Sequence, residues 1–366
     1  MALVGSSWSR TLASSGVLAA VLLIGCAGDD PVDPAMLSVL EAGPFEVGFR
    51  SWEHTYDAPG GYGPRTIQLN VWFPSDEVGL LTPTYERIFR DDDVWRDVDP
   101  RPPVHDAGYP VHVYSHGHLG FGGSSADLMR YYASHGWVCI APDHLGNTLF
   151  NALDPRPASI YFTRATDVSA ALDALEALPD EDPLSRSVTE RVVLSGHSFG
   201  VHTTWAIAGA EFDNARARCD AGELPSGECT EAEIEVMEAG LRDTRVAAVI
   251  PMAGSIDRGW FGPTGHNSVS VPVLSMSGTA DPVGADTQFA ETSELRMTWV
   301  QVTGGCHQAF AIGGCDTISD EDAFHIVNSY ALAFGRQHVL GDVLPEEVGV
   351  LDGSVVVSDL ATFMRH

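Results

Sequence analysis

The chain has 366 residues, 44% of them hydrophobic, and its formal net charge is −30. All 20 basic residues are arginines, set against 50 acidic residues. A surface this acidic repels phosphate backbones and anionic head groups, so we expect no nucleic acid partner and no electrostatic binding to anionic lipid. The length suits one α/β domain that carries insertions.

The N-terminal residues have the pattern of a targeting segment. A positive charge at Arg10 precedes an apolar stretch, residues 17–24, that is too short to span a bilayer as a mature helix. The stretch leads into Leu23-Ile24-Gly25-Cys26, which resembles the lipobox of bacterial lipoproteins. In that motif the cysteine becomes the lipidated first residue of the mature chain.

This pattern predicts a lipid-anchored, exported protein. Residues 1–25 would be the signal peptide, Cys26 the lipidation site and residues 26–40 the tether, and Ala27 after the cysteine favours the outer membrane. The alternative is an ordinary secretory signal that is cut elsewhere. Cys26 would then be incidental, and the protein would be secreted or periplasmic.

Export implies an oxidising compartment, in which cysteines pair. Cys219 and Cys229 flank a loop rich in glycine and proline, and Cys306 and Cys315 flank a second glycine-containing loop. We therefore expect two local disulfides, with Cys139 buried and free on a strand. The sequence alone also permits other pairings.

Strands and helices alternate along the chain, after a leading antiparallel pair of strands. This alternation predicts a mostly parallel sheet with helices on both faces, and hence an α/β fold. The expected strands are residues 45–56, 66–73, 110–114, 137–141, 191–194, 245–252, 271–276 and 297–302. The expected helices are residues 124–135, 160–178, 201–210 and 320–334.

Two segments interrupt this alternation inside an expected domain of residues 41–340. Residues 75–109 are rich in proline and aspartate, and residues 211–244 carry the Cys219–Cys229 loop and an acidic helix. Both are predicted to be insertions, and one hypothesis places the second over a rim of the active site. Residues 341–366 form a C-terminal tail whose packing the pattern does not indicate.

The most informative motif is Gly196-His197-Ser198-Phe199-Gly200, which contains G-x-S-x-G between a buried strand and a helix. That context is typical of a nucleophile elbow, in which a tight turn exposes the serine hydroxyl above the sheet. Gly196 and Gly200 leave room for the turn, because a side chain at either position would crowd it. Ser198 is therefore the expected nucleophile.

A serine hydroxyl needs a base to take its proton, usually a histidine that a carboxylate orients. In this class of fold the order along the chain is serine, acid, histidine. Asp281 and His307 follow in that order, each just past the end of an expected strand, where α/β sheets build their sites. Asp257, after the preceding strand, remains a competing acid.

Acyl transfer also needs donors for the developing oxyanion. We expect one donor to be the backbone N–H of Phe199, directly after the nucleophile. The second should come from the glycine-rich loop 115–120, where the N–H of His118 is the first choice and that of Leu119 the next.

A cluster of histidines raises the alternative of a metal site. His112, His116, His118 and His144, together with Asp143, carry groups that could bind zinc. The spacing of histidine and carboxylate that is typical of zinc sites does not accompany them. We therefore expect no metal and no cofactor.

Several motifs together look like the platelet-activating-factor acetylhydrolase family and its dienelactone-hydrolase-like bacterial relatives. The similarity covers roughly residues 45–335, with the insertions unmatched. The segments that carry it are Val71-Trp72-Phe73-Pro74, Tyr114-Ser115-His116-Gly117, residues 132–138, Ala141-Pro142-Asp143-His144, residues 196–200 and Cys306-His307-Gln308-Ala309-Phe310. The resemblance implies an α/β-hydrolase fold and no metal. It implies that the protein hydrolyses carboxylic esters, including short-acyl lipid or phospholipid esters. It also implies that Ser198 is the nucleophile, His307 the base, and the amides of His118 and Phe199 the oxyanion hole.

The sequence departs from this family at the acid. The eukaryotic acetylhydrolases carry their acid directly after the strand that here ends in Pro251-Met252-Ala253-Gly254, where no aspartate stands. The turn Gly278-Thr279-Ala280-Asp281-Pro282 instead resembles the dienelactone-hydrolase and polyester-hydrolase placement. A dienelactone-type or cutinase-like polyester hydrolase is therefore an alternative. A peptidase or thioesterase would use the same groups, and a non-catalytic lipoprotein binding module is the alternative from another class.

Overall fold

The structure is a computed structural model that describes residues 37–222, 224, 226–227, 229–341 and 343–366. The expected signal peptide, the expected lipidation site Cys26 and most of the expected tether lie outside the described residues. Within the described part of the chain, no helix combines the length and apolar character needed to cross a membrane.

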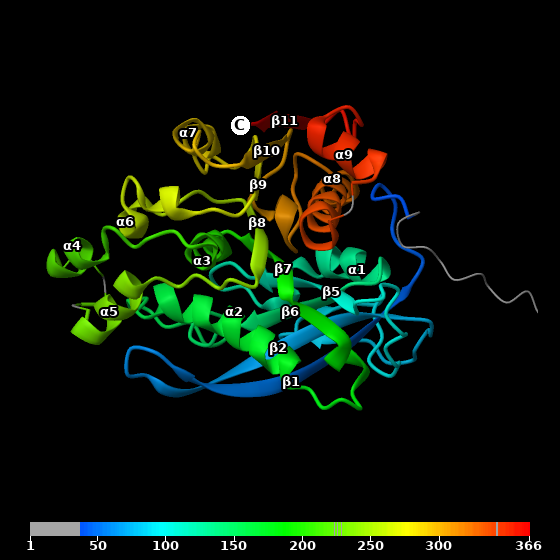
Figure 1. The fold of residues 1–366 in the computed structure, drawn as a ribbon, viewed down its shortest axis with the longest axis horizontal. Coiled ribbons are helices and arrows are strands. Elements are labelled where there is room, and N and C mark those ends of the chain that lie inside the picture. Colours follow the sequence, from blue (N-terminus) through cyan, green and yellow to red (C-terminus); the bar gives the residue numbers. More distant parts are fainter. Residues whose placement is uncertain (1–36, 223, 225, 228, 342) are drawn as a thin grey trace, which may run out of the picture. The chain divides into compact units, whose positions relative to one another are not determined.

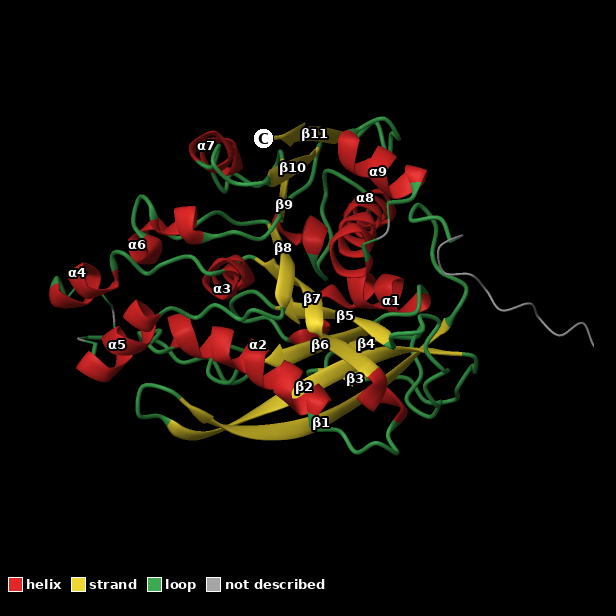
Figure 2. Cartoon of the chain, viewed as in Figure 1, coloured by secondary structure: helices red, strands yellow, loops and turns green. Residues whose placement is uncertain are grey.

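A single twisted sheet forms the centre of the fold, and nine strands belong to it in the described residues (Figures 1 and 2). Its strand order is β1-β2-β6-β5-β7-β8-β9-β10-β11, with neighbours from β6 to β10 parallel and β1, β2 and β11 antiparallel. The strands are β1 (Glu46–Ala58), β2 (Gly63–Ser75), β5 (Tyr109–Ser115), β6 (Val138–Asp143), β7 (Ser187–His197), β8 (Val246–Met252), β9 (Val273–Gly278), β10 (Met297–Val302) and β11 (Ala361–Arg365).

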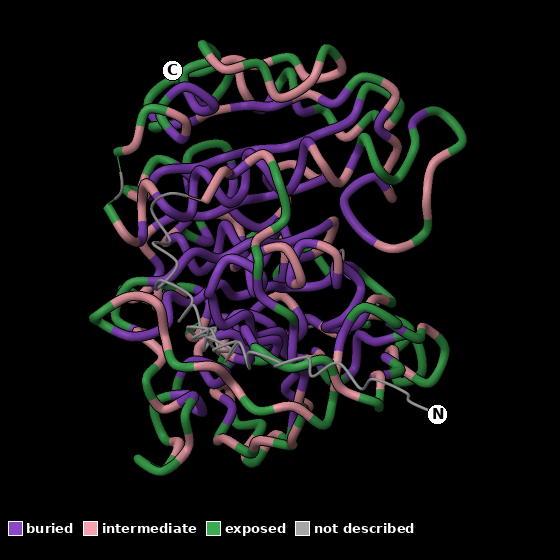
Figure 3. Tube along the Cα trace, turned by 90° about the vertical axis from the view of Figure 1, so that its right-hand side faces the viewer, coloured by how far each residue is buried: buried purple, intermediate pink, exposed green. Residues whose placement is uncertain are grey.

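Helices cover both faces of this sheet, with α2 and α3 on one side and α1 and α8 on the other (Figure 1). Each side has its own cluster of buried apolar residues, and buried segments fill the interior of the molecule (Figure 3). The helices are α1 (Ala126–Ser134), α2 (Ile160–Glu176), α3 (Phe199–Ala208), α4 (Ala215–Asp220), α5 (Glu231–Ala239), α6 (Arg258–Phe261), α7 (Ala285–Glu291), α8 (Asp320–Gly335) and α9 (Pro345–Asp352).

This arrangement confirms the α/β fold that the sequence predicts, with small corrections at the ends of elements. The strand before the nucleophile begins at Ser187 rather than at residue 191, and the helix after it begins at Phe199 rather than at residue 201. The tail is not a free end, because it forms α9 and then β11, which pairs antiparallel with β10. An edge strand that closes a sheet from a distant part of the chain has no local signature.

The two expected insertions differ in how they fold. Residues 75–109 contain a short antiparallel ribbon, β3 (Thr84–Tyr85) with β4 (Phe89–Arg90), and Trp95 bridges to β1. Residues 211–244 contain α4 and α5, and the disulfide Cys219–Cys229. The second predicted disulfide, Cys306–Cys315, is also present, and Cys139 is buried and free. Both predicted pairings are therefore confirmed.

Candidate active site

Ser198 occupies a sharp turn between β7 and α3, with φ 55° and ψ −116°. Few residues other than glycine adopt such a backbone, so the conformation is strained and must be held by its surroundings. A methyl group on Gly196 would lie 2.4 Å from the carbonyl oxygen of Gly200, and one on Gly200 would lie 2.0 Å from the carbonyl oxygen of Ser115. Both glycines are therefore required for close packing of this turn, as the sequence predicts.

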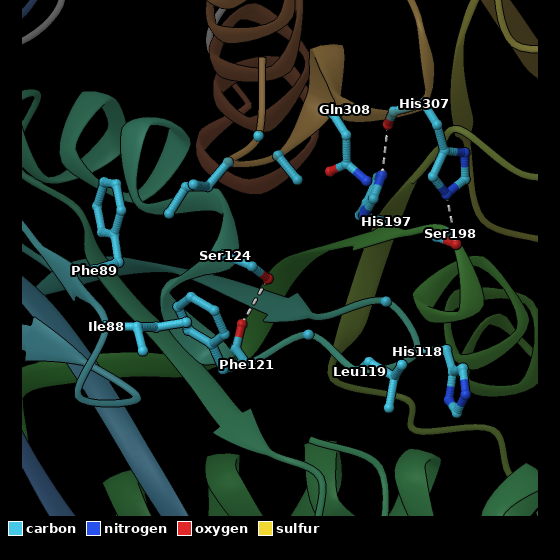
Figure 4. A pocket seen from close by; sticks show the side chains of 15 residues that line it. Ile88, Phe89, His118, Leu119, Phe121, Ser124, His197, Ser198, His307 and Gln308 are labelled. Carbon is cyan, nitrogen blue, oxygen red and sulfur yellow. Dashed lines mark hydrogen bonds between the residues drawn. The ribbon is translucent and has the colours of Figure 1, made fainter. Parts of the chain in front are cut away.

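Ser198, His307 and Asp281 form a continuous hydrogen-bonded chain. The Nε2 atom of His307 lies 2.8 Å from Ser198 Oγ (Figure 4). Its Nδ1 atom lies 2.8 Å from Asp281 Oδ2. Because a carboxylate can only accept, Nδ1 donates, and Nε2 is left free to accept the serine proton. The Asp281 side chain is 10% exposed and that of His307 is 40% exposed, so this series of hydrogen bonds leads from the interior towards the surface.

The loops that carry the acid and the histidine touch each other directly. A methyl group on Gly278, at the end of β9, would lie 1.9 Å from the carbonyl oxygen of Gly305. The N–H of Ala280 donates to the same oxygen at 2.9 Å. This close approach of two backbones sets the distance between Asp281 and His307, and it explains why glycines precede both residues.

The competing acid, Asp257, lies elsewhere. Its carboxylate accepts the N–H of Gly259 at the start of α6, and it stands 3.6 Å from Arg218 Nη1 and 3.7 Å from His202 Nδ1. The structure thus brings Asp281 to His307 and assigns Asp257 a helix-capping and ion-pairing position.

The loop between β5 and α1 lies against the nucleophile. A methyl group on Gly117 would be 3.1 Å from Ser198 Cβ, and His118 stands at the pocket beside Leu119 (Figure 4). The N–H of Leu119, the alternative oxyanion donor, is already bonded to the carbonyl oxygen of Asn147 at 3.1 Å. Phe199 is the first residue of α3, so its N–H has no acceptor within the helix.

The side chains considered as metal ligands have other partners. Nε2 of His112 bonds Ser195 at 2.7 Å, and both ring nitrogens of His116 and of His144 are engaged within the fold. Asp143 accepts the N–H of Gly122 at 2.5 Å, and burial raises its pKa to about 6. Among the residues with a described placement, no group of three or more histidine, cysteine or acidic side chains could hold a metal ion.

Two buried side chains near the site were not predicted from the sequence. His197 donates from Nε2 to the carbonyl oxygen of His307 at 2.8 Å, and burial lowers its pKa to about 4, so the ring is neutral near pH 7. From within the core, Arg164 of α2 donates to the carbonyl oxygen of His116 in the loop 115–120 and to Oδ1 of Asn147. A partner far away in the sequence leaves no local signal.

A pocket of about 560 Å³ opens beside Ser198 and His307 (Figure 4). Its walls come from the loop 117–121, from the segment 307–313 inside the Cys306–Cys315 disulfide, and from Ile88 and Phe89 of the first insertion. No described residue of the insertion 211–244 lines this pocket. The hypothesis that this insertion covers a rim of the site is therefore unsupported, and residues 75–109 contribute to the rim instead.

A mostly parallel sheet with a nucleophile elbow after its central strand is the α/β-hydrolase fold. A family model described as Chlorophyllase matches residues 100–217, about a third of the chain. A comparison with curated proteins gives no match. Among solved structures, the ferulic acid esterase from Streptomyces cinnamoneus superimposes with a TM-score of 0.61 at 19% identity, covering 88% of this chain and 98% of that one. At this identity the likeness establishes the fold alone.

Proposed function

We propose that this protein is a serine hydrolase that cleaves carboxylic esters. The observation that carries the proposal is the unbroken chain from Asp281 through His307 to Ser198, with 2.8 Å at each step, at the edge of an open pocket. A serine and a histidine at this separation are poised for transfer of the hydroxyl proton as the oxygen attacks.

The reaction has two halves. Ser198 Oγ attacks the ester carbonyl carbon while Nε2 of His307 takes its proton, and the negative oxygen is held by the N–H groups of His118 and Phe199. His307 then gives that proton to the leaving alkoxide, so an alcohol departs and an acyl-enzyme remains. Water repeats the cycle and releases the carboxylic acid. The Asp281 carboxylate keeps Nδ1 protonated and stabilises the imidazolium that forms in each half.

Esters are favoured over amides and thioesters by what the chain resembles. One solved structure with the same fold is of a ferulic acid esterase, and the partial family match is to Chlorophyllase. The resemblance to acetylhydrolases points the same way. A catalytically dead binding module would be expected to have lost part of the constellation, whereas here all three side chains are present and in contact.

The pocket supports a substrate with an apolar group. Ile88, Phe89, Phe121 and Ile312 contribute apolar side chains to its wall, and Ile88 (58% exposed) and Leu119 (44% exposed) stand open to solvent at its mouth. A short-acyl lipid or phospholipid ester would fit such a surface, and a polyester or dienelactone-type ester is the alternative.

The proposal includes export and a lipid anchor. Two disulfides are consistent with an oxidising compartment, and the lipobox-like sequence before Cys26 supports a lipidated N-terminus. Labelling with a radioactive fatty acid in a bacterial host tests the anchor. The full chain should carry label and Cys26→Ser should not; an unlabelled wild-type chain would favour a secreted or periplasmic protein.

The central test is a series of p-nitrophenyl esters of increasing acyl length, with wild type and Ser198→Ala. Ser198→Ala should lower kcat by about a million-fold, as removal of the nucleophile does in other serine hydrolases. The matched control is Ser195→Ala, which removes a buried hydroxyl of the same strand that bonds His112, and which should turn over like wild type. Unchanged turnover in Ser198→Ala would refute the serine mechanism, and no turnover of any ester by wild type would favour the binding module.

A further inference from the structure

The peptide bond between Gly117 and His118 is held by its carbonyl group. The oxygen of Gly117 accepts from Nδ1 of His116 at 2.7 Å and from the N–H of Gly120 at 3.1 Å. A peptide unit is planar, and in its trans form the C=O and N–H point in opposite directions. Holding the oxygen of Gly117 therefore fixes the direction of the N–H of His118.

The two contacts of the His116 ring specify one protonation state. The Gly117 oxygen can only accept, so Nδ1 must carry a hydrogen. The backbone N–H of His144 can only donate. It points at Nε2 of His116 at 3.0 Å, so Nε2 must carry no hydrogen. Both contacts require the neutral ring with its hydrogen on Nδ1. Burial agrees with this, since it holds the pKa of His116 well below its usual range.

The adjoining peptide groups are anchored from the core by Arg164. Its guanidinium bonds the carbonyl oxygen of His116, and its Nη1 donates to Asn147 Oδ1 at 2.6 Å. The Asn147 carboxamide then donates from Nδ2 to Nδ1 of His118 at 2.6 Å, and its backbone oxygen accepts the N–H of Leu119. The peptide groups on both sides of Gly117–His118 are thus connected to Arg164, directly at His116 and through Asn147 at Leu119.

The same region holds a second serine–histidine–aspartate chain that cannot act on a substrate. Ser115 Oγ lies 2.9 Å from His144 Nε2, and His144 Nδ1 lies 2.9 Å from Asp167 Oδ2, with all three side chains buried. Arg164 also donates to Ser115 Oγ, at 3.1 Å. Because Ser115 is fully buried, these three residues act structurally: they fix His144, whose backbone N–H in turn orients His116.

We propose that His116 is a positioning residue for the ester hydrolysis proposed above: as the neutral Nδ1–H tautomer it holds the Gly117–His118 peptide so that the N–H of His118 faces the oxyanion. The side chain touches neither substrate nor reacting atoms. It acts through the peptide group, and Arg164 prevents the neighbouring peptides from rotating. The proposal rests on the proposed function, because it assigns the oxyanion donor a support.

The matched set of variants replaces His116 by Asn, Gln and Leu. The amide nitrogen of Asn reaches the place of Nδ1, that of Gln reaches the place of Nε2, and Leu offers no hydrogen bond. We expect kcat of His116→Asn to stay within about tenfold of wild type, and kcat of the Gln and Leu variants to fall by about 100-fold or more, the usual effect of losing one oxyanion donor. KM should change little. The control for a general effect on packing is His112→Leu, which replaces a different buried histidine, on β5.

A second readout separates positioning from folding. A trifluoromethyl ketone, which forms a tetrahedral adduct with the serine, should lose affinity across the series in proportion to kcat/KM, while the non-fluorinated ketone should bind all variants alike. Equal losses in the Asn and Leu variants, or a fall in kcat without a fall in trifluoromethyl ketone affinity, would overturn the proposal.

The tautomer can also be measured without any variant. Nitrogen-15 NMR of the wild-type protein should show His116 protonated at Nδ1 and bare at Nε2, and the opposite tautomer would overturn the proposal whatever the activity. If wild type hydrolyses esters but the tautomer or the Asn rescue fails, only the role of His116 is refuted. If wild type hydrolyses no ester, the proposed function itself fails.

Discussion

Replacement of Asp281 by asparagine should remove most of the activity and leave the fold intact. The carboxylate lies 2.8 Å from Nδ1 of His307 and is 10% exposed, so an imidazolium formed during the reaction has an adjacent, poorly screened negative charge. Two unit charges about 4 Å apart at an effective dielectric constant of about 20 attract by about 4 kcal/mol, which corresponds to about a 1000-fold change in rate. An asparagine that donates to Nδ1 would also favour the tautomer that cannot accept the Ser198 proton. In serine proteases the same substitution costs about 10⁴-fold.

Steady-state kinetics on a p-nitrophenyl ester test this expectation, with Asp257→Asn as the matched control. We expect kcat of Asp281→Asn to fall by about 10³- to 10⁴-fold, with little change in KM. Asp257→Asn should keep wild-type kcat, because Asp257 caps α6 and asparagine caps helices as well as aspartate does. A larger loss in Asp257→Asn, or a loss below about tenfold in Asp281→Asn, would refute the assignment of the acid.

Two further predictions concern acid stability and the disulfides. Burial lowers the pKa of several histidines, among them His112 and His135 to about 3 and His197, His202 and His338 to about 4. The unfolded chain takes up protons below about pH 6.5 while these folded side chains do not. The contribution of these histidines to the free energy of unfolding is therefore fully present above pH 6.5, and it falls on acidification by roughly 1.4 kcal/mol per pH unit for each histidine. The carboxyl group of Asp143, with its pKa raised to about 6, acts in the opposite direction as a single group. Urea unfolding from pH 7.5 to pH 5 measures the sum, and a flat profile would contradict it. Replacing Cys306 and Cys315 by serine should lower kcat, because their loop carries His307 and part of the pocket wall, whereas the same change at Cys219 and Cys229 should lower only the free energy of unfolding, by about 2–5 kcal/mol. Equal kcat in the two double variants would contradict this reasoning.

Local pattern was enough to predict the elbow, both disulfides and the sheet except its edge strand β11. The strand, the serine and the helix of the elbow are consecutive, so residues 187–208 reveal their own turn. The proximity of Asp281 and His307 was predictable because parallel strands place their carboxyl ends at one edge of the sheet, which turns chain order into proximity.

The supports of the site could not be predicted in this way. His116 was considered as a metal ligand, and only its three-dimensional partners, the Gly117 oxygen and the His144 N–H, give it a different role. Arg164 contacts a carbonyl group 48 residues away, and nothing in its own helix indicates that loop. Sequence adjacency to the elbow helix likewise does not determine where an irregular segment packs: Ile88 and Phe89 of residues 75–109 line the pocket, and no described residue of 211–244 does.

The most direct test of a nucleophilic Ser198 is covalent labelling with an alkyl fluorophosphonate, followed by intact-mass and peptide mass spectrometry. The phosphonate replaces the serine proton and loses fluoride, so one adduct should form per chain and map to the peptide that contains Ser198. His307→Ala should label much more slowly, since the base no longer takes the proton. Ser198→Ala should remain unlabelled. An adduct that persists in Ser198→Ala, or no adduct on the wild-type protein, would contradict the serine hydrolase account.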